Sequence, residues 1–334
     1  MNAIGFIAGS LGCFFAFCAQ GTAAQAAGDT PRFEDTAAAV VHVRTRALAE
    51  ARTREALGAE REGSGIVIDE AGHVLTIGYL VIEAGSVELT TGDGRSVPGA
   101  VAGYDHASGF AVVRALAPLG VKPVALGTSE GLAVQDPVLV LPFGGHHAAR
   151  LAFVVSRRSF TGNWEYLLES AIFTTPPASD WSGSALVDAE GRVVGVGSLL
   201  LRDTTDDERV VPGNLFVPID LVKPILADLI RHGRVQGPAR PWLGLSAEEL
   251  QGHLLVGRVS PDGPAERAGI RNGDIVVAVG KDAVRTRAEL YRKVWALGAA
   301  GTEVPLRVLQ GAEVRDIRLR SMDRLDYLKT IPTY

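Results

Sequence analysis

Gly63-Ser-Gly-Ile-Val-Ile-Asp-Glu-Ala-Gly-His-Val-Leu-Thr76 contains two short apolar runs with turn-forming residues between them. The runs Gly65–Asp69 and His73–Thr76 are rich in β-branched side chains, which fit a pleated strand. Asp, Ala and Gly between the runs favour a reversal of the chain. The segment therefore predicts a pair of short β-strands rather than a helix.

Runs of the same kind recur on both sides of this segment, separated by Gly, Asp and Pro. Val40–Thr45 alternates as a strand does, after a short helix expected over Phe33–Ala39. Ala47–Arg61 is rich in Ala, Glu and Arg and fits either a helix or a charged loop. Further strands are expected at Ser86–Thr90, Phe110–Arg114, Pro137–Leu141, Leu151–Val155, Ser184–Val187 and Arg192–Val196. Many short strands between turns predict antiparallel barrels or a sandwich.

The pattern changes near residue 219. A long helix is expected over Ile219–His232, because apolar residues recur on one face and Gly233 follows as a stop signal. Gly237-Pro-Ala-Arg-Pro241 has the composition of a linker. Beyond it, strands mix with two helix candidates, Pro264–Ala268 and Arg287–Leu297. The chain therefore divides into a larger β-rich part and a smaller mixed part.

Length and composition fit a soluble globular protein of about two domains. The chain has 334 residues, of which 47% are hydrophobic and 21% charged, and this balance argues against disorder. The formal net charge is −5 and no basic block stands out. A nucleic-acid partner is therefore not expected.

The N-terminal residues 1–27 have the pattern of a secretory signal peptide. An apolar run, Ile4–Cys18, is followed by small residues that end in Ala24-Gln25-Ala26-Ala27. A periplasmic or secreted location is therefore expected, and the alternative is an uncleaved segment that anchors the protein to the membrane. Both cysteines, Cys13 and Cys18, fall in this leader. The mature chain is thus expected to hold neither a disulfide nor a thiolate metal site.

Gly263-Pro-Ala-Glu-Arg-Ala-Gly-Ile-Arg-Asn-Gly-Asp-Ile-Val276 is the most specific motif in the chain. With residues 63–76, Ala125–Ser129, Val138–Gly144 and Leu215–Ile219, it resembles the HtrA/Deg trypsin-like serine proteases that carry a C-terminal PDZ domain. The resemblance covers Val40 to Leu319. It implies a mainly β fold, in which a trypsin-like double antiparallel β-barrel precedes a small α+β PDZ domain. The implied boundaries are 32–235 for the protease-fold domain, 236–241 for the linker and 242–322 for the PDZ domain.

The same resemblance implies that the catalytic triad is degenerate. It aligns Tyr79 with the histidine and Gly109 with the aspartate, and it keeps the nucleophile as Ser182. Asp180 stands where the family has the glycine of the oxyanion hole. A phenol is a poor general base near neutral pH, and glycine has no side chain to orient a base. A carboxylate at the oxyanion hole adds negative charge where hydrogen-bond donors are needed.

No other histidine is placed to replace the missing base. His73, His106 and the pair His146-His147 are expected to be surface or loop residues, because no carboxylate is spaced to form a recognisable partner. Two adjacent histidines are also a weak metal signal. No cofactor and no metal site are expected.

The PDZ segment offers a peptide-binding site. Trp242-Leu243-Gly244-Leu245 resembles the loop whose backbone N–H groups bind the C-terminal carboxylate of a peptide. The peptide would add as a strand beside Leu245–Ala247 and face the helix over Thr286–Leu297. The alternative is a PDZ domain that only packs on its own protease domain.

Three functions follow from these patterns. The first is an inactive protease homologue of the cell envelope that binds peptides, protein C-termini or unfolded chains. The second is an active serine endopeptidase of protein quality control with a rearranged triad around Ser182. The third is a structural subunit in a hetero-oligomer, since the resemblance implies that members form trimers, whether homo- or hetero-trimers.

Overall fold

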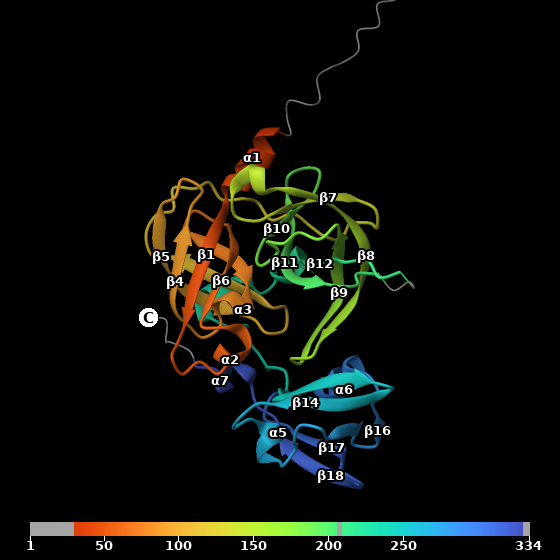
Figure 1. The fold of residues 1–334 in the computed structure, drawn as a ribbon. Helices are drawn as coiled ribbons and strands as arrows, with labels where there is room; N and C mark the ends of the chain where they lie inside the picture. The colour runs from red at the N-terminus through yellow and green to blue at the C-terminus, as the bar shows by residue number, and fades with distance from the viewer. Residues whose placement is uncertain (1–29, 206–208, 330–334) are drawn as a thin grey trace, which may run out of the picture.

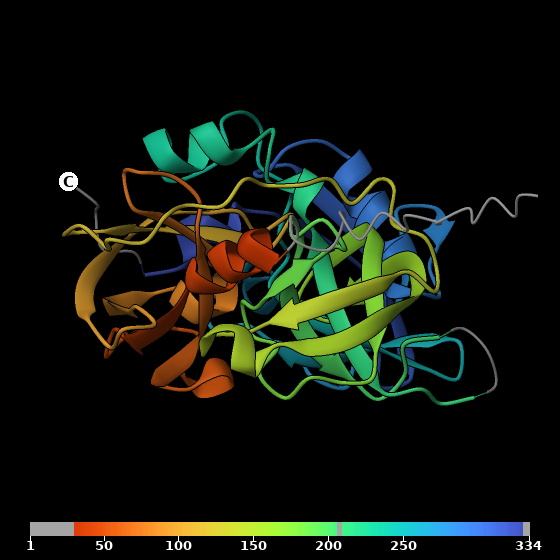
Figure 2. The ribbon, with the colours of Figure 1, turned by 90° about the horizontal axis from the view of Figure 1, so that it is seen from above.

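The computed structural model describes residues 30–205 and 209–329. Two six-stranded antiparallel barrels lie side by side, and a smaller sheet domain lies at one end of the pair (Figure 1). Figure 2 shows the two barrels from above, the first orange and the second green. The expected mainly β fold is confirmed. The expected leader, residues 1–27 with Cys13 and Cys18, lies outside the described residues.

The first barrel has the strand order β1-β2-β3-β6-β5-β4. Its strands are β1 (Val40–Ala47), β2 (Glu60–Val67), β3 (His73–Ile77), β4 (Ala84–Thr90), β5 (Ser96–Tyr104) and β6 (Phe110–Ala115). The helices α1 (Thr30–Ala38), α2 (Arg54–Leu57) and α3 (Gly78–Val81) accompany it. The opening sequence segment forms the predicted pair, because β2 and β3 are antiparallel neighbours with Ile66 opposite Leu75. Most of Ala47–Arg61, which fitted a helix or a loop, forms turns and the short helix α2, while its two ends belong to β1 and β2.

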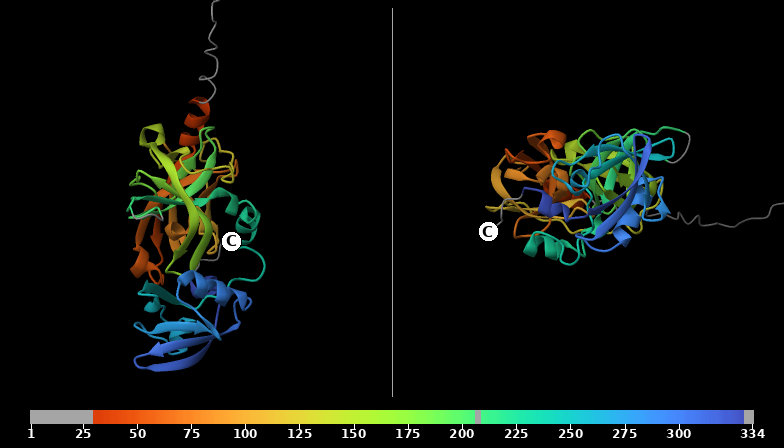
Figure 3. Two further views of the ribbon diagram at one scale, coloured as in Figure 1. Left: turned by 90° about the vertical axis from the view of Figure 1, so that its right-hand side faces the viewer. Right: turned by 90° about the horizontal axis from the view of Figure 1, so that it is seen from below.

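The second barrel has the order β10-β11-β12-β9-β8-β7. Its strands are β7 (Pro137–Leu141), β8 (Arg150–Gly162), β9 (Tyr166–Thr175), β10 (Ala185–Val187), β11 (Val193–Leu201) and β12 (Gly213–Pro218), with the 3₁₀ turn η1 (Gly145–Ala148). The strands β8 and β9 are long and form a hairpin with Gly162 opposite Tyr166. Figure 3 shows this yellow-green hairpin extending from the barrel to the smaller domain.

The long helix expected over Ile219–His232 is wrong. The structure has a 3₁₀ turn, η2 (Ile219–Leu221), and a separate helix, α4 (Leu226–His232). Pro224 explains the interruption, because proline has no N–H to donate and disfavours a helical conformation at the preceding residue. Gly233 ends α4 with φ 73°, as its position in the sequence indicates.

The smaller domain is a sheet of order β13-β14-β15-β17-β18, with β16 paired to β15. Its strands are β13 (Leu245–Leu250), β14 (His253–Val259), β15 (Ile275–Val279), β16 (Asp282–Ala283), β17 (Glu303–Gln310) and β18 (Glu313–Arg320). The helices are α5 (Pro264–Arg267), α6 (Arg287–Ala296) and α7 (Arg324–Tyr327). Thr286 and Glu289 form a capping box that starts α6. Within the described residues, no helix has the length and apolar character that a membrane crossing requires.

Candidate functional site

Ser182 lies at the junction of the two barrels, in the loop between β9 and β10. Its carbonyl accepts a hydrogen bond of 2.8 Å from the N–H of Ser64, on β2 of the first barrel. The next residue, Gly183, has φ 71°, and a Cβ atom there would lie 2.0 Å from the Ser64 carbonyl. Glycine is therefore required at this position. The loop holds the serine in a defined place between the barrels.

Tyr79, on α3, is the side chain beside the serine. Its hydroxyl lies 3.0 Å from Ser182 Oγ and donates a 2.8 Å hydrogen bond to the Ser198 carbonyl. A phenol has one proton, and a carbonyl can only accept, so the proton between Tyr79 and Ser182 comes from the serine. Burial raises the pKa of Tyr79 to about 12. The phenol is thus neutral near pH 7 and a weak proton acceptor.

Gly109, the residue before β6, is hydrogen-bonded to the start of α3. Its carbonyl accepts a 2.7 Å bond from the N–H of Gly78, the residue before Tyr79. Gly109 has φ 82°, and a Cβ atom would lie 2.9 Å from Tyr166 Oη. The Tyr166 hydroxyl donates to the Ser108 carbonyl at 2.7 Å. A buried tyrosine therefore fills the space that a side chain at residue 109 would need.

Asp180 is exposed on the surface of the same loop. Its carboxylate accepts a 3.0 Å hydrogen bond from the Ser179 hydroxyl. The structure thus brings Tyr79 and Ser182 into contact, while Asp180 stays at the rim of the cleft.

All seven histidines lie in the described part of the chain, and none hydrogen-bonds to Ser182. His73 Nδ1 lies 2.6 Å from an Asp69 oxygen, so this histidine does have a carboxylate partner. The expectation of no carboxylate partner is wrong there, because the turn at residues 69–72 brings the two side chains together. His106 is held elsewhere, with Nε2 donating to the Glu165 carbonyl at 3.1 Å. Burial and the charge of Arg324 lower the pKa of His106 well below its ordinary value.

The loop at residues 242–245 binds a carboxylate in the structure, and this carboxylate belongs to the chain itself. The N–H groups of Leu243, Gly244 and Leu245 donate to the side chain of Glu165 at 2.8, 2.7 and 3.3 Å. Trp242 is not one of the donors, because its N–H pairs with the Met322 carbonyl at 3.0 Å. Glu165 was not predicted as a functional residue, because one glutamate in a turn carries no local signal.

A cavity of about 560 Å³ lies between the barrels and the smaller domain. Tyr79 and Gly109 line it on one side, and Leu245 and Ser246 of β13 line it on the other. The cavity therefore extends from Tyr79, the neighbour of Ser182, to the edge strand of the smaller domain. Residues 30–205 and 209–329 contain no group of three or more His, Cys, Asp or Glu residues that could hold a metal ion.

Two family models match the chain, a trypsin-like peptidase domain over residues 63–196 and a PDZ domain over residues 241–320. The putative serine protease HhoA of Synechocystis is 30% identical over 71% of this chain and 64% of its own length. A probable periplasmic DegP-like endoprotease of Halomonas elongata is 26% identical over 80% and 57%. The serine endoprotease DegS of Escherichia coli is 25% identical over 84% and 86%.

The chain thus spans about three fifths of the length of the first two of these relatives. Solved structures show the same fold. The HtrA-type protease AlgW with a decapeptide matches with a TM-score of 0.54 at 20% identity, over 92% of this chain and 99% of that one. The serine endoprotease from Yersinia pestis matches with a TM-score of 0.51 at 22% identity, over 88% and 97%.

Proposed function

Because the chain belongs to the HtrA-type trypsin-like proteases with a C-terminal PDZ domain, we propose that it is a non-catalytic member that binds polypeptide C-termini. In this proposal, Ser182 is the remnant of the nucleophile, and Tyr79, Gly109 and Asp180 occupy the positions of the histidine, the aspartate and the oxyanion-hole glycine. The PDZ loop at residues 243–245 is the binding site.

The contact between Tyr79 and Ser182 carries the first half of the proposal. Hydrolysis at a serine needs a base that removes the hydroxyl proton, and loss of the serine or histidine alone costs on the order of 10⁶ in turnover in a serine protease. The nearest candidate here is a phenol whose pKa burial raises to about 12. Gly109 offers no carboxylate to orient a base. The serine hydroxyl therefore stays protonated and inert.

The carboxylate at residues 243–245 supports the second half. Three backbone N–H groups converge on one carboxylate there, which is the geometry that a peptide C-terminus requires. The strand β13 continues from this loop and lies at the edge of its sheet, so a peptide can add beside it. AlgW, a protein of the same fold, has been solved with a decapeptide.

The cell envelope is the proposed location. Relatives from Halomonas elongata and Haemophilus influenzae are named as periplasmic proteases. Residues 1–27 have the composition of an export signal. Assembly as a homo- or hetero-trimer stays a prediction.

A fluorophosphonate probe and casein together test the loss of activity. The purified wild-type protein should neither be labelled nor degrade casein, and Ser182→Ala should behave identically. Labelling of the wild type that disappears in Ser182→Ala would establish an active endopeptidase with a rearranged triad and refute the proposal. An active relative assayed in parallel shows that the probe and the casein are competent.

A further inference from the structure

The tip of the hairpin β8–β9 packs against the PDZ domain rather than extending into solvent. The turn between the strands ends at Glu165, whose backbone has φ 59° and whose residue is only 4% exposed. A glutamate in the left-handed region is uncommon, and its burial in the interface of another domain is costly unless its charge is hydrogen-bonded. The surroundings of this side chain therefore need an explanation.

The Glu165 carboxylate makes four hydrogen-bond contacts with three consecutive backbone N–H groups. Leu243 donates to both oxygens, at 3.1 and 2.8 Å, while Gly244 and Leu245 donate to one oxygen at 2.7 and 3.3 Å. Gly244 has φ 76°, so the loop turns its N–H groups toward one point. Such a cluster binds a carboxylate whether it ends a peptide or a side chain.

A second contact fixes the tip against α6. The Tyr291 hydroxyl donates to the Gly162 carbonyl at 3.0 Å and accepts from the Glu165 N–H at 3.2 Å. Tyr291 is 1% exposed. Beside it, Arg292 of α6 forms a 2.8 Å ion pair with Glu169 of β9, but both side chains are largely exposed, so this pair contributes little to the docking. The hairpin tip therefore contacts both the loop before β13 and α6, the two elements between which an added peptide strand would lie.

We propose that Glu165 is an internal ligand of the PDZ domain, which the C-terminal carboxylate of a polypeptide must displace in order to bind. The inference rests on the proposed function and adds its regulation. The chain's own carboxylate and a peptide carboxylate need the same three N–H groups, so the two cannot bind together. The apparent peptide affinity is then lowered by the fraction of molecules in which the hairpin is docked.

Three full-length variants test this inference against the wild type. Glu165→Ala removes the internal ligand, and Glu165→Gln keeps its size and one acceptor without the charge. Glu169→Ala is the matched control, because it removes a carboxylate from the same hairpin and the same interface without changing the loop. Near-ultraviolet circular dichroism and thermal melting establish that each variant is folded.

The probe is a fluorescent pool of random decapeptides, prepared once with a free C-terminal acid and once as the C-terminal amide. At a protein concentration well below saturation, Glu165→Ala should retain at least about tenfold more free-acid peptide than the wild type. Glu165→Gln should lie between them, Glu169→Ala should match the wild type, and the amidated pool should show no gain. Equal retention of the free-acid pool by the wild type and Glu165→Ala would overturn the inference.

Hydrogen exchange at the amides of Leu243, Gly244 and Leu245 separates the inference from the function on which it rests. These amides should exchange faster in Glu165→Ala than in the wild type or Glu169→Ala. Unchanged exchange would show that the carboxylate does not hold the loop, and would overturn the inference whatever the peptides do. Faster exchange with no peptide retained by any protein would refute the peptide-binding function and support the internal contact.

Discussion

Tyr79 satisfies two polar groups beside Ser182 with one neutral side chain. Its hydroxyl donates a hydrogen bond to the Ser198 carbonyl and accepts one from the Ser182 hydroxyl. A histidine would leave a titratable group there, whereas a phenol with a pKa raised to about 12 does not change its charge at physiological pH. Under the proposed function, this neutral side chain leaves Ser182 without a base.

Tyr79→Phe should therefore cost stability without affecting hydrolysis. The change leaves the Ser198 carbonyl without its donor, and we expect the free energy of unfolding to fall by about 1–2 kcal/mol. Ser182→Ala is the control, because it preserves the bond from Tyr79 to Ser198 and should cost less. Urea denaturation measures both values. A larger loss in Ser182→Ala would contradict this account of the hydrogen bonds.

Gly109 lies in a position that does not readily accept an aspartate. A side chain there meets Tyr166 Oη at 2.9 Å and requires φ 82°, so we expect Gly109→Asp to destabilise the fold by on the order of 2 kcal/mol. Gly92→Asp is the control, since nothing lies within 4 Å of a Cβ atom there. Thermal melting should show a clear drop for Gly109→Asp and little change for Gly92→Asp. Equal melting temperatures would mean that the site tolerates an aspartate.

If the proposed loss of hydrolysis is correct, we expect its recovery to need more than three substitutions. Tyr79→His, Gly109→Asp and Asp180→Gly replace the divergent groups, but Tyr166 still occupies the space beside residue 109. Adding Tyr166→Phe removes the nearest atom, the hydroxyl oxygen. If the cleft is otherwise intact, the fourfold variant should cleave casein faster than the threefold variant.

At the scale of elements, the hairpin β8–β9 joins the two sites. Glu165 is the last residue of its turn and Tyr166 is the first residue of β9. Glu165 points its carboxylate at the PDZ loop, while the Tyr166 hydroxyl reaches the Ser108 carbonyl beside Gly109. Neighbouring residues thus contact the loop at residues 243–245 and the backbone beside Gly109. Displacement of the hairpin tip by a peptide would alter the packing at both places.

The docking of this hairpin should depend on pH. Burial raises the pKa of Glu165 to about 7, although the three N–H groups and Arg324 act in the opposite direction. A raised pKa means that the docked carboxyl favours its proton. The stabilisation is therefore complete below the ordinary pKa of the carboxyl, 4.5, and is lost as the pH rises through 7.

Melting of the wild type relative to Glu165→Gln measures this dependence. Between about pH 5 and pH 8, the free energy of unfolding of the wild type should fall relative to that of Glu165→Gln, by on the order of 3 kcal/mol at most. The other titratable groups near Glu165 are not expected to cause this pH dependence. Burial and the charge of Arg324 lower the pKa of His106 well below its ordinary value, and burial raises the pKa of Tyr291, so neither shift matches that of Glu165. A pH-independent difference would contradict the titration.

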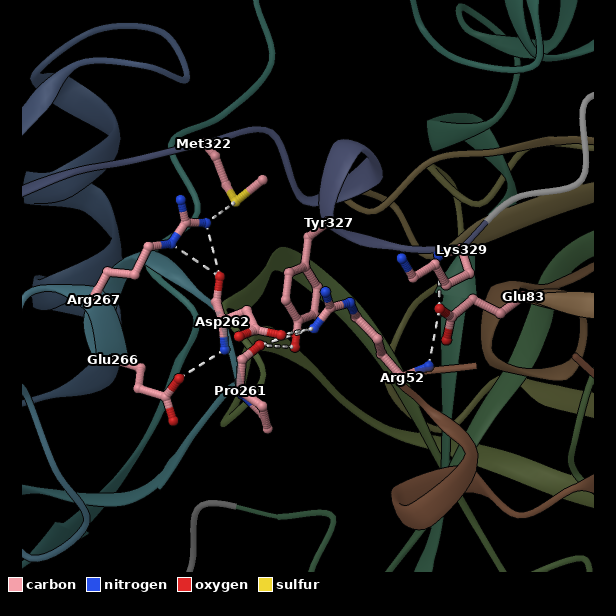
Figure 4. A network of polar contacts seen from close by, with 9 residues as sticks. All are labelled: Arg52, Glu83, Pro261, Asp262, Glu266, Arg267, Met322, Tyr327 and Lys329. Atoms are coloured by element: carbon pink, nitrogen blue, oxygen red, sulfur yellow. Dashed lines mark hydrogen bonds and ion pairs between the residues drawn. The ribbon is translucent and has the colours of Figure 1, made fainter. Parts of the chain in front are cut away.

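At the scale of the whole molecule, a second group of contacts joins the domains at a distance from Glu165. Figure 4 shows Arg52 of the first barrel donating to the Pro261 carbonyl at 2.9 Å and lying near Asp262 and Tyr327. The Arg52 guanidinium lies 4.2 Å from the centre of the Tyr327 ring. Glu83 accepts the N–H of Lys329, in the segment after α7, at 2.7 Å. The C-terminal segment therefore returns from the PDZ domain to the first barrel.

The contacts at Glu165 and at Arg52 should each be enough to keep the two domains docked. Arg52→Ala and Glu165→Ala should each leave the domains docked, whereas the double variant should increase the fraction of molecules with separated domains. It weakens both groups of contacts at once and leaves the contacts of Tyr291, Arg292 and Lys329 to hold the interface. Small-angle scattering should show a larger radius of gyration for the double variant than for either single variant. Arg318→Ala, which removes an exposed ion pair within the PDZ sheet, is the control. A single variant as expanded as the double would show that one contact suffices.

Several features were readable from the sequence because they depend on neighbouring residues. The strands at residues 40–45, 73–76 and 137–141 have short-range patterns of apolar residues, and the structure confirms them. Gly233 and Thr286 mark the ends of helices through local backbone chemistry. The prediction of one helix over residues 219–232 was wrong for a local reason as well, because Pro224 interrupts the helix despite the apolar pattern.

Residue identity and short-range pattern were sufficient to predict the two-domain β fold, and they show that Tyr79 and Gly109 carry neither an imidazole nor a carboxylate. What surrounds these two residues depends on tertiary packing. Tyr166, which lies on a later strand of the chain, fills the space at Gly109. Glu165 reaches Leu243 across a separation of 78 residues. Such contacts are set by how the hairpin and the PDZ domain pack together, and no local pattern encodes that packing.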